Sequence, residues 1–359
     1  RTQKRDNSVL GYDYIKTVTK AVALFPAWFY IKTMKNTHLE HPEDCLLTSR
    51  EDFMEMLRFL RCIDNTVSVK YDGAPAIVWG INPENNRFFV GTKSVFNKVK
   101  IKINYTHADI ERNHGDKPRV ASILHICMDS LPRLNGIYQG DFIGYGGDDE
   151  YTPNCITYKF PDIISPESIV FAAHTHYIGN TIKDAEVRFG FPWDVSPPEV
   201  YANRQKGKPF GQDRVRFLNT NVTISSRHRR INYLISLAGA AANFVKFPEG
   251  KEAKELKVAV NKCIREQKDI ADAGMTKMQT YLYKLIMHIK ELIMDGMIAD
   301  ENVVCQFEGQ ECDHEGYVQT NRYGTFKLVD RRAFSYRNFT TAKKWLDKGA
   351  TITFPMGDS

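Results

Sequence analysis

The stretch Ser68–Gly80, SVKYDGAPAIVWG, constrains the fold of this chain more than any other. A β-branched lead-in and the apolar run Ala76–Trp79 predict two strands joined by a turn. Lys70 ends the first strand beside Gly73, which lets a ligand approach the backbone closely. An amine held in an apolar pocket or beside other cations can become a nucleophile near neutral pH. The stretch therefore predicts either a reactive lysine or an ordinary β-turn with Asp72 and Gly73 at its corner.

Three later segments are likewise short stretches that combine apolar residues with a glycine and a charged residue. Gly136–Phe142 is an apolar strand that ends in Gly-Asp, His314–Val318 reads HEGYV, and Tyr323–Val329 reads YGTFKLV. Together with Lys-x-Asp-Gly at 70–73, they resemble, in order, four motifs of the covalent nucleotidyltransferase superfamily of ATP-dependent DNA and RNA ligases and mRNA capping enzymes. The amino-acid sequence around Lys70 also resembles that of a group of ligase-like proteins of large tailed phages.

The resemblance implies an α+β fold, with a ligase-type nucleotidyltransferase core of twisted antiparallel sheets that hold the nucleotide between them. It implies ATP and Mg²⁺ as cofactors, and a lysyl-AMP on Lys70 that is passed to a 5′-phosphate and sealed to a 3′-hydroxyl. DNA ligases and capping enzymes carry an OB fold after the last motif, and residues 330–359 are too few to build one. We therefore expect an ATP-dependent RNA ligase without a C-terminal OB fold, acting on nucleic-acid ends with RNA favoured over DNA.

The resemblance also assigns roles to single residues. Lys70 is the expected nucleophile, and Asp72 orients the turn or the lysine proton. Glu315 holds the metal, directly or through water. Lys327 neutralises the α-phosphate and lowers the pKa of Lys70 by like-charge repulsion. Asp141 bonds the ribose hydroxyls, and an aromatic ring of the strand 169–177 (Phe171 or Tyr177) stacks on the base. The expected nucleotide-binding residues are Val69, Gly73, Lys93, Asp141, Phe171 and Lys327.

Two positions depart from the family pattern. Asp141 stands where the third motif has a glutamate, and Thr325 stands where the fifth motif, usually Lys-x-Lys, has its first lysine. One phosphate-binding cation is therefore missing or supplied from elsewhere. These departures leave open a catalytically weakened ligase-like module that binds nucleotide or nucleic acid, as a structural component of a phage particle or complex. A third hypothesis keeps the Lys70 chemistry and transfers the nucleotide to a protein or small molecule.

The charge of the chain permits a polyanionic partner without requiring one. The formal net charge is +6 and the isoelectric point is near 8.8. Residues 200–218 form a basic, loop-like segment that suits a nucleic-acid backbone, although a solvated linker is an equal alternative. The expected nucleic-acid contacts are Lys98, Arg204, Lys206, Lys208, Arg214 and Arg216.

Cysteines and histidines give weaker signals. Seven scattered cysteines without paired spacing indicate reduced thiols and a cytoplasmic protein, in the host cytoplasm if the chain is of phage origin. Cys305, Cys312 and His314 suggest a zinc site, with core or loop thiols as the favoured alternative. The segment 174–176, HTH, suggests a histidine phosphoesterase but lacks a second such motif. The acidic loop 144–153 is expected to be solvated rather than to bind a cation.

The chain divides into four expected parts: 1–50, a helical N-terminal extension; 51–200, the first part of the nucleotidyltransferase core; 201–300, a basic loop and helical insertion; and 301–359, the last part of the core with a short tail. The apolar segment Ala21–Ile31 is too short to span a bilayer, so we expect no membrane partner. Apolar spacing predicts helices from Ser49 onward, near 120–134 and near 276–295.

Overall fold

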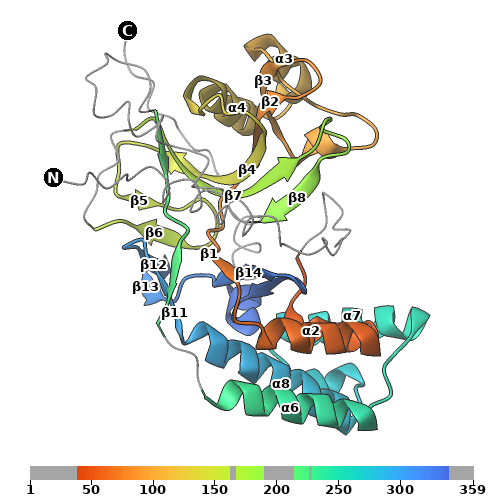
Figure 1. The fold of residues 1–359 in the computed structure, drawn as a ribbon. Helices are drawn as coiled ribbons and strands as arrows, with labels where there is room; N and C mark the ends of the chain where they lie inside the picture. Colours follow the sequence, from red (N-terminus) through yellow and green to blue (C-terminus); the bar gives the residue numbers. More distant parts are fainter. Residues whose placement is uncertain (1–38, 162–166, 190–213, 226–228, 339–359) are drawn as a thin grey trace, which may run out of the picture. The chain divides into compact units, whose positions relative to one another are not determined.

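The computed structural model describes residues 39–161, 167–189, 214–225 and 229–338 (Figure 1). All of them belong to one compact unit, Thr33–Ser359. Helices and open antiparallel sheets make up this unit, which confirms a mixed α+β fold. Most of the expected N-terminal extension, including Ala21–Ile31, lies outside the described residues.

The largest sheet has the strand order β3-β2-β4-β7-β8, all antiparallel, with β9 paired to β7 in parallel. A turn at residues 83–86 joins β2 to β3. Apolar side chains of this sheet contribute to a hydrophobic cluster on each of its two faces. Its strands are β2 (Ala76–Asn82), β3 (Arg87–Thr92), β4 (Ile137–Tyr145), β7 (Ile169–Ile178), β8 (Glu186–Phe189) and β9 (Val215–Phe217).

Two helices, α3 (His107–His114) and α4 (Pro118–Ser130), pack on one face of this sheet (Figure 1). Leu124 and Cys127 of α4 share a core with Trp79 of β2. The opposite face of the sheet is left for the cavity described below.

A smaller sheet of three strands has the order β1-β14-β15, with bounds Thr66–Val69, Tyr317–Asn321 and Gly324–Leu328. Its register sets Val69 opposite Tyr317, and Val318 opposite Lys327. The first, fourth and fifth motifs are thus neighbours, although about 250 residues separate β1 from β14. The turn after Val69 carries the chain from this sheet into the large one.

Two further small sheets make up the rest of the β-structure among the described residues. One has the order β13-β12-β6-β5, and the other pairs β10 with β11. Tyr158 of β6 and Cys305 of β12 pack in one core with Val69, so these strands support the back of the Lys70 turn. The strands are β5 (Glu150–Tyr151), β6 (Thr157–Lys159), β10 (Val222–Ile224), β11 (Met297–Ala299), β12 (Val304–Phe307) and β13 (Gln310–Cys312).

The remaining helices form a separate layer, which has its own hydrophobic core around α8. The Thr276 hydroxyl accepts from Gln279 N–H and the Gln279 side chain bonds back, a capping box that starts α8. The predicted apolar face of α8 is buried, and Lys284 and His288 are exposed as expected. The elements are η1 (Pro42–Leu47), α2 (Arg50–Arg61), α6 (Arg230–Ala241), η4 (Ala242–Phe244), α7 (Gly250–Arg265), η5 (Ile270–Ala273), α8 (Lys277–Met294), a short helical turn η2 (Lys93–Phe96) beside the large sheet, and helical residues 331–338.

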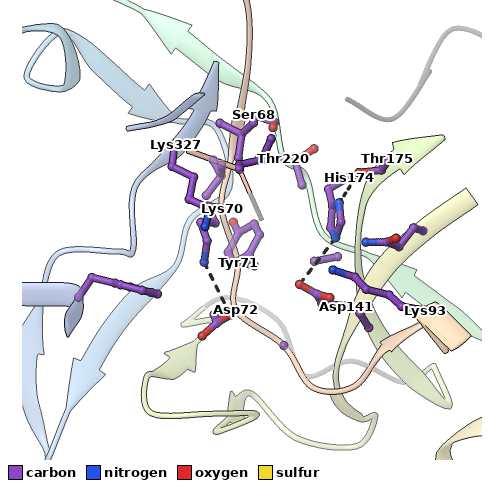
Figure 2. A pocket seen from close by; sticks show the side chains of 18 of the residues that line it. Ser68, Lys70, Tyr71, Asp72, Lys93, Asp141, His174, Thr175, Thr220 and Lys327 are labelled. Atoms are coloured by element: carbon purple, nitrogen blue, oxygen red, sulfur yellow. Dashed lines mark hydrogen bonds and ion pairs between the residues drawn. The ribbon is translucent and has the colours of Figure 1, made fainter. Parts of the chain in front are cut away.

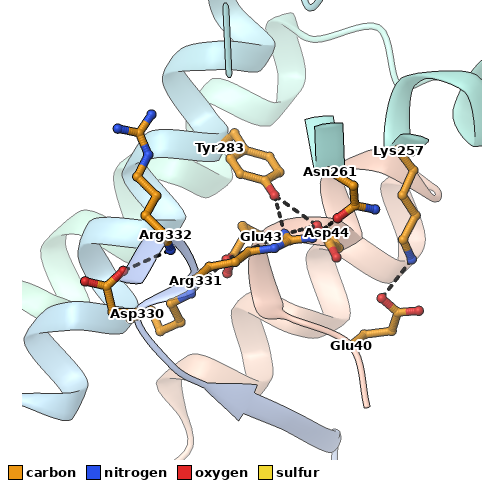
Figure 3. Close-up of polar contacts among 10 residues, drawn as sticks. Glu40, Glu43, Asp44, Lys257, Asn261, Tyr283, Asp330, Arg331 and Arg332 are labelled. Atoms are coloured by element: carbon orange, nitrogen blue, oxygen red, sulfur yellow. Dashed lines mark hydrogen bonds and ion pairs between the residues drawn. The ribbon is translucent and has the colours of Figure 1, made fainter. Parts of the chain in front are cut away.

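A buried polar network joins this layer to the segment that follows β15 (Figure 3). Lys290 of α8 pairs with Glu43 of η1 at 2.7 Å, and both side chains are almost fully buried. Arg331 pairs with Asp44, which also accepts the Tyr283 hydroxyl at 2.9 Å. Because these charges have lost their water, each depends on its partner. The network fixes the position of residues 331–338, which reach the cavity.

Candidate active site

A cavity of about 770 Å³ lies between the large sheet and the three-stranded sheet. Val69, Lys70 and Lys327 line it from the small sheet and the turn that follows (Figure 2). Asp141 and His174 line it from the large sheet. Its volume is that of a typical small-molecule site.

Lys70 enters the cavity directly after β1. Its backbone N–H donates to Gly316 O at 2.9 Å, which extends the pairing of β1 with β14 by one residue. Its ammonium group contacts Oε2 of Glu315 and lies 3.7 Å from Oδ1 of Asp72 and 5.0 Å from the centre of the Phe334 ring. The lysine is therefore held by two carboxylates and an aromatic face.

Glu315 is held behind the amine by a turn that requires glycine. Gly316 has φ +125°, and a Cβ there would lie 2.2 Å from Leu328 O. His314 Nδ1 accepts the Gly316 N–H at 3.0 Å, so the ring proton sits on Nε2, which donates to the Tyr317 hydroxyl. Burial lowers the pKa of His314, so the ring stays neutral. Glu315 itself does not line the cavity, and its side chain is fully buried.

The charges around Lys70 keep the amine protonated. Burial by itself would lower the pKa of Lys70, but Glu315 and Asp72 outweigh it and raise the pKa above the usual value. The predicted lowering by like-charge repulsion is therefore wrong for this arrangement. Repulsion acts on Lys327 instead: burial and then Lys70 lower its pKa.

Glu315 and Asp72 both lie near the Lys70 amine, and this arrangement changes the pKa of Glu315, which is the more deeply buried of the two. Burial raises the pKa of Glu315 to about 8; Lys70 opposes the rise and Asp72 adds to it. Glu315 Oε1 is buried and has no hydrogen-bond partner among the described residues. A group whose pKa lies near neutrality and which touches a buried amine is suited to accept its proton.

Oxygen ligands for a metal ion are available at the same place. Mg²⁺ binds through one or two carboxylates and keeps several waters. Asp72 on the cavity wall and the unpaired Oε1 of Glu315 fit this requirement. Across the part of the chain that the structure describes, no three His, Cys, Asp or Glu side chains are grouped so that they could hold a metal ion. Cys305, Cys312 and His314 therefore do not form the zinc site that the sequence suggested.

The turn from Asp72 to Gly73 is anchored on β6 and β4. The Asp72 N–H donates to the Tyr158 hydroxyl at 2.8 Å, and Asn154 donates to its carboxylate. A Cβ on Gly73 would lie 2.5 Å from Phe142 O, so the chain can pass this close to β4 only at a glycine. These contacts hold the Lys70 backbone in place.

The large-sheet wall carries Asp141, Lys93 and His174 (Figure 2). Asp141 lies on β4 opposite Ala76, 3.7 Å from His174 Nε2. His174 Nδ1 is 2.7 Å from the Thr175 hydroxyl. Lys93 begins the turn η2, directly after β3. The wall thus faces the lysines of the small sheet with a carboxylate, an imidazole and a further cation.

A family model matches residues 36–281 and 271–343 of this chain, and it describes a family of unknown function (DUF6267). The chain belongs to this family. No curated protein matches the chain, and neither does a solved structure. No helix among the described residues is long and apolar enough to cross a membrane.

In this family member, the cavity brings together seven of the predicted residues. Lys70, Asp72 and Lys327 line it, and Glu315, which is not part of the lining, contacts Lys70. The other predicted residues on the cavity wall are Val69, Gly73, Lys93 and Asp141.

Phe171 is not among them. Its ring is fully buried and packs against Trp79 at 5.2 Å and Phe217 at 6.0 Å, on the helix-covered face of the sheet. The predicted base-stacking role does not fit this position. Both faces of β7 are apolar, so sequence alternation could not tell the core face from the cavity face. Tyr177 does line the cavity.

Arg216 does not fit the predicted nucleic-acid contact either. It pairs with Glu301 at 2.8 Å and lies over the Phe160 ring at 4.6 Å, with its side chain mostly buried. Arg214 and Lys98 are exposed, and neither lines the cavity. Arg204, Lys206 and Lys208 lie outside the described residues.

Sequence reasoning missed three contributors from the helical parts. Arg265, at the end of α7, lines the cavity, and so do Phe334 and Asn338 of the helical segment 331–338. No local signal marks them, because their position depends on how α7 and the segment after β15 pack together. The sequence singles out His174, but only the structure shows that it lies at a register shift of β7 against β4, between Ala173 and Thr175, and faces Asp141.

Proposed function

We propose that this protein is an ATP-dependent nucleotidyltransferase that forms a covalent lysyl-AMP on Lys70, and that it serves as an RNA ligase. One observation carries the proposal. The Lys70 ammonium touches a buried Glu315 carboxyl at the edge of a nucleotide-sized cavity, with Lys327 on the same wall. Segments distant in sequence converge there, in keeping with a ligase-type core of two sheets around the nucleotide.

The cations on the cavity wall suit a triphosphate. Lys327 stands beside the nucleophile, Lys93 on the opposite wall, and Arg265 reaches in from α7. Thr325 cannot act as a cation, and its hydroxyl bonds Thr320 at 3.0 Å. Arg265 is therefore our candidate for the phosphate-binding cation that the fifth motif lacks. Asp141 accepts from the ribose hydroxyls.

The covalent step begins with the proton of Lys70. Lys70 gives it to Glu315, whose Oε2 is already in contact, and the free amine attacks the α-phosphorus. A P–N bond forms, the P–O bond to pyrophosphate breaks, and the nitrogen releases its second proton to the departing pyrophosphate. Lys327 and Arg265 neutralise the charge on that departing group. Mg²⁺, when bound, neutralises phosphate charge, and Asp72 with Oε1 of Glu315 would hold it.

The sealing step is expected to follow from the adenylate. The 5′-phosphate of a nucleic-acid end displaces Lys70 from the α-phosphorus, and a 3′-hydroxyl then displaces AMP. RNA is the favoured substrate, and the cytoplasm, in a phage the host cytoplasm, is the expected compartment. The exposed Lys98 and Arg214 are the described residues we propose for the nucleic-acid backbone.

A second candidate function is a nucleotide-binding module without the covalent step. The observations that favour it are Asp141 and Thr325 in place of a glutamate and a lysine, and a Lys70 whose pKa is raised rather than lowered. Such a module would bind nucleotide in the same cavity without attaching it.

The two functions separate in one labelling experiment. The full chain, freed of bound AMP, is incubated with Mg²⁺ and α-labelled ATP or GTP and run on a denaturing gel. We expect label from ATP, lost in Lys70→Ala and kept in Lys262→Ala, an exposed lysine on the same protein outside the cavity. Label from GTP alone indicates capping-like chemistry. Binding without label supports the module instead.

A further inference from the structure

Two histidines face each other on the surface of α3 and α4, away from the cavity. His107 Nδ1 lies 2.7 Å from His125 Nδ1. His107 Nε2 lies 3.1 Å from Asp129 Oδ1, and His125 Nε2 lies 2.6 Å from Glu111 Oε1. The four side chains form a row of carboxylate, imidazole, imidazole and carboxylate.

The rings meet edge to edge. Their planes are 18° from parallel, yet their centres are 4.9 Å apart, well beyond the separation of the two Nδ1 atoms. The Nδ1 atoms therefore lie between the ring centres, with their lone-pair directions aimed at each other. Stacked rings would instead bring the centres as close as the atoms.

The positions of the ring protons on His107 and His125 determine what must lie between their two Nδ1 atoms. A carboxylate oxygen only accepts, so each Nε2 carries its ring proton and donates it to Asp129 or Glu111. A neutral imidazole with its proton on Nε2 has a lone pair on Nδ1. Two lone pairs at 2.7 Å repel each other unless a positive centre comes between them. The candidates are a proton and a metal ion.

We propose that His107 and His125 form a two-histidine site for a divalent transition-metal ion of the zinc type. Metal-binding histidines commonly donate their second ring N–H to a carboxylate, which fixes the tautomer and makes the other nitrogen a better ligand. Here both histidines have such a carboxylate. Because no larger ligand group converges among the described residues, water completes the coordination.

Binding requires only a small opening of the pair. Zinc binds imidazole nitrogen at about 2.0–2.1 Å in tetrahedral geometry, so the two nitrogens must move apart to roughly 3.4 Å. The His107 side chain is half exposed and sits at the first position of α3, after the cap Thr106. Rotation of this side chain supplies the movement. The ion then joins α3 to α4 across the outer face of the large sheet.

The site is independent of the proposed nucleotide chemistry. None of the four side chains lines the cavity, and α3 and α4 lie on the opposite face of the large sheet from Asp141 and His174. A failure of either proposal therefore leaves the other standing.

The test is calorimetric titration of Zn²⁺ into the full, reduced chain. We expect one site in the wild type that is absent in His107→Ala and in His125→Ala. His288→Ala is the matched control, because His288 is also exposed on a helix beside a carboxylate, Glu291. The double variant Glu111→Gln, Asp129→Asn should bind about 10- to 100-fold more weakly.

A second readout separates lost binding from lost folding. Zn²⁺ should raise the Tm of the wild type and of His288→Ala, and leave the Tm of His125→Ala unchanged. Equal Zn²⁺ binding by the wild type and the two alanine variants would overturn the proposal, since thiols or other histidines would then hold the ion. Absence of binding to the wild type, with NMR detecting one proton shared by the two Nδ1 atoms, would also overturn it.

Discussion

In the proposed reaction, Lys70, Glu315 and Asp72 make the first step depend on the proton that Lys70 must give up. Burial would lower the pKa of the Lys70 amine, but Glu315 and Asp72 raise it, and burial raises the pKa of Glu315 to about 8. The lysine can become a nucleophile only by giving its proton to a neighbour. Glu315 is the neighbour in contact with it.

The rate of lysyl-AMP formation should rise with pH through neutrality and past about 8. Glu315 must be ionised to accept the proton, and Lys70 must lose it, so both requirements favour alkaline conditions. Single-turnover labelling across this range measures the profile. A proton and Mg²⁺ also compete for Glu315, so less Mg²⁺ should suffice at higher pH. A flat profile for both quantities would exclude Glu315 from the step.

The pH dependence of the free energy of unfolding should also report the ionisation of Glu315. The pKa of Glu315 is raised from 4.5 to about 8 in the folded state, so its contribution is complete below 4.5 and is lost as the pH rises through about 8. Glu315→Gln cannot ionise and avoids this loss. Urea unfolding should therefore show Glu315→Gln gaining stability relative to the wild type as pH rises, by at most about 1.4 kcal/mol per pH unit. A difference that does not change with pH would contradict the assignment.

At the scale of single elements, we propose that Arg265 at the end of α7 supplies the phosphate-binding cation that β15 lacks. Arg265→Ala should weaken ATP use in the labelling reaction by about 10- to 100-fold, since a hydrogen bond to a charged group contributes about 1.5–3 kcal/mol. Lys262→Ala on the same helix should have no effect. The ATP concentration at half-maximal labelling rate is the measurement. If Arg265→Ala and Lys262→Ala behave alike, the missing cation comes from elsewhere.

Local elements could be predicted from the sequence, and their partners could not. Ser49 starts α2, and α8 spans Lys277–Met294, close to the predicted 276–295. The order β3-β2-β4-β7-β8 depends on contacts between distant segments, which local spacing does not report. Sequence motifs predict Lys70, Asp72, Glu315 and Lys327 as site residues. The side of the sheet that Phe171 faces and the ion pair of Arg216 could be seen only in the structure.

At the scale of the whole described unit, the buried network in Figure 3 links η1, α8 and the segment after β15. Lys290→Met should destabilise the protein by about 3–5 kcal/mol, because the buried Glu43 loses its close partner at 2.7 Å and keeps only Arg331 at 3.8 Å. Adding Glu43→Leu should recover most of that loss. Urea denaturation of the wild type, the single variant and the double variant measures both effects. A double variant no more stable than Lys290→Met would show that the pair itself is needed.

The central claim is that one lysine among those in the cavity carries the nucleotide. The most direct test is intact mass and peptide mapping of the protein after reaction with ATP and Mg²⁺. We predict one added AMP per chain, on the peptide containing Lys70, labile in acid as a phosphoramidate is, and absent in Lys70→Arg. An adduct on Lys93 or Lys327, or no adduct in protein that binds ATP, would contradict the account.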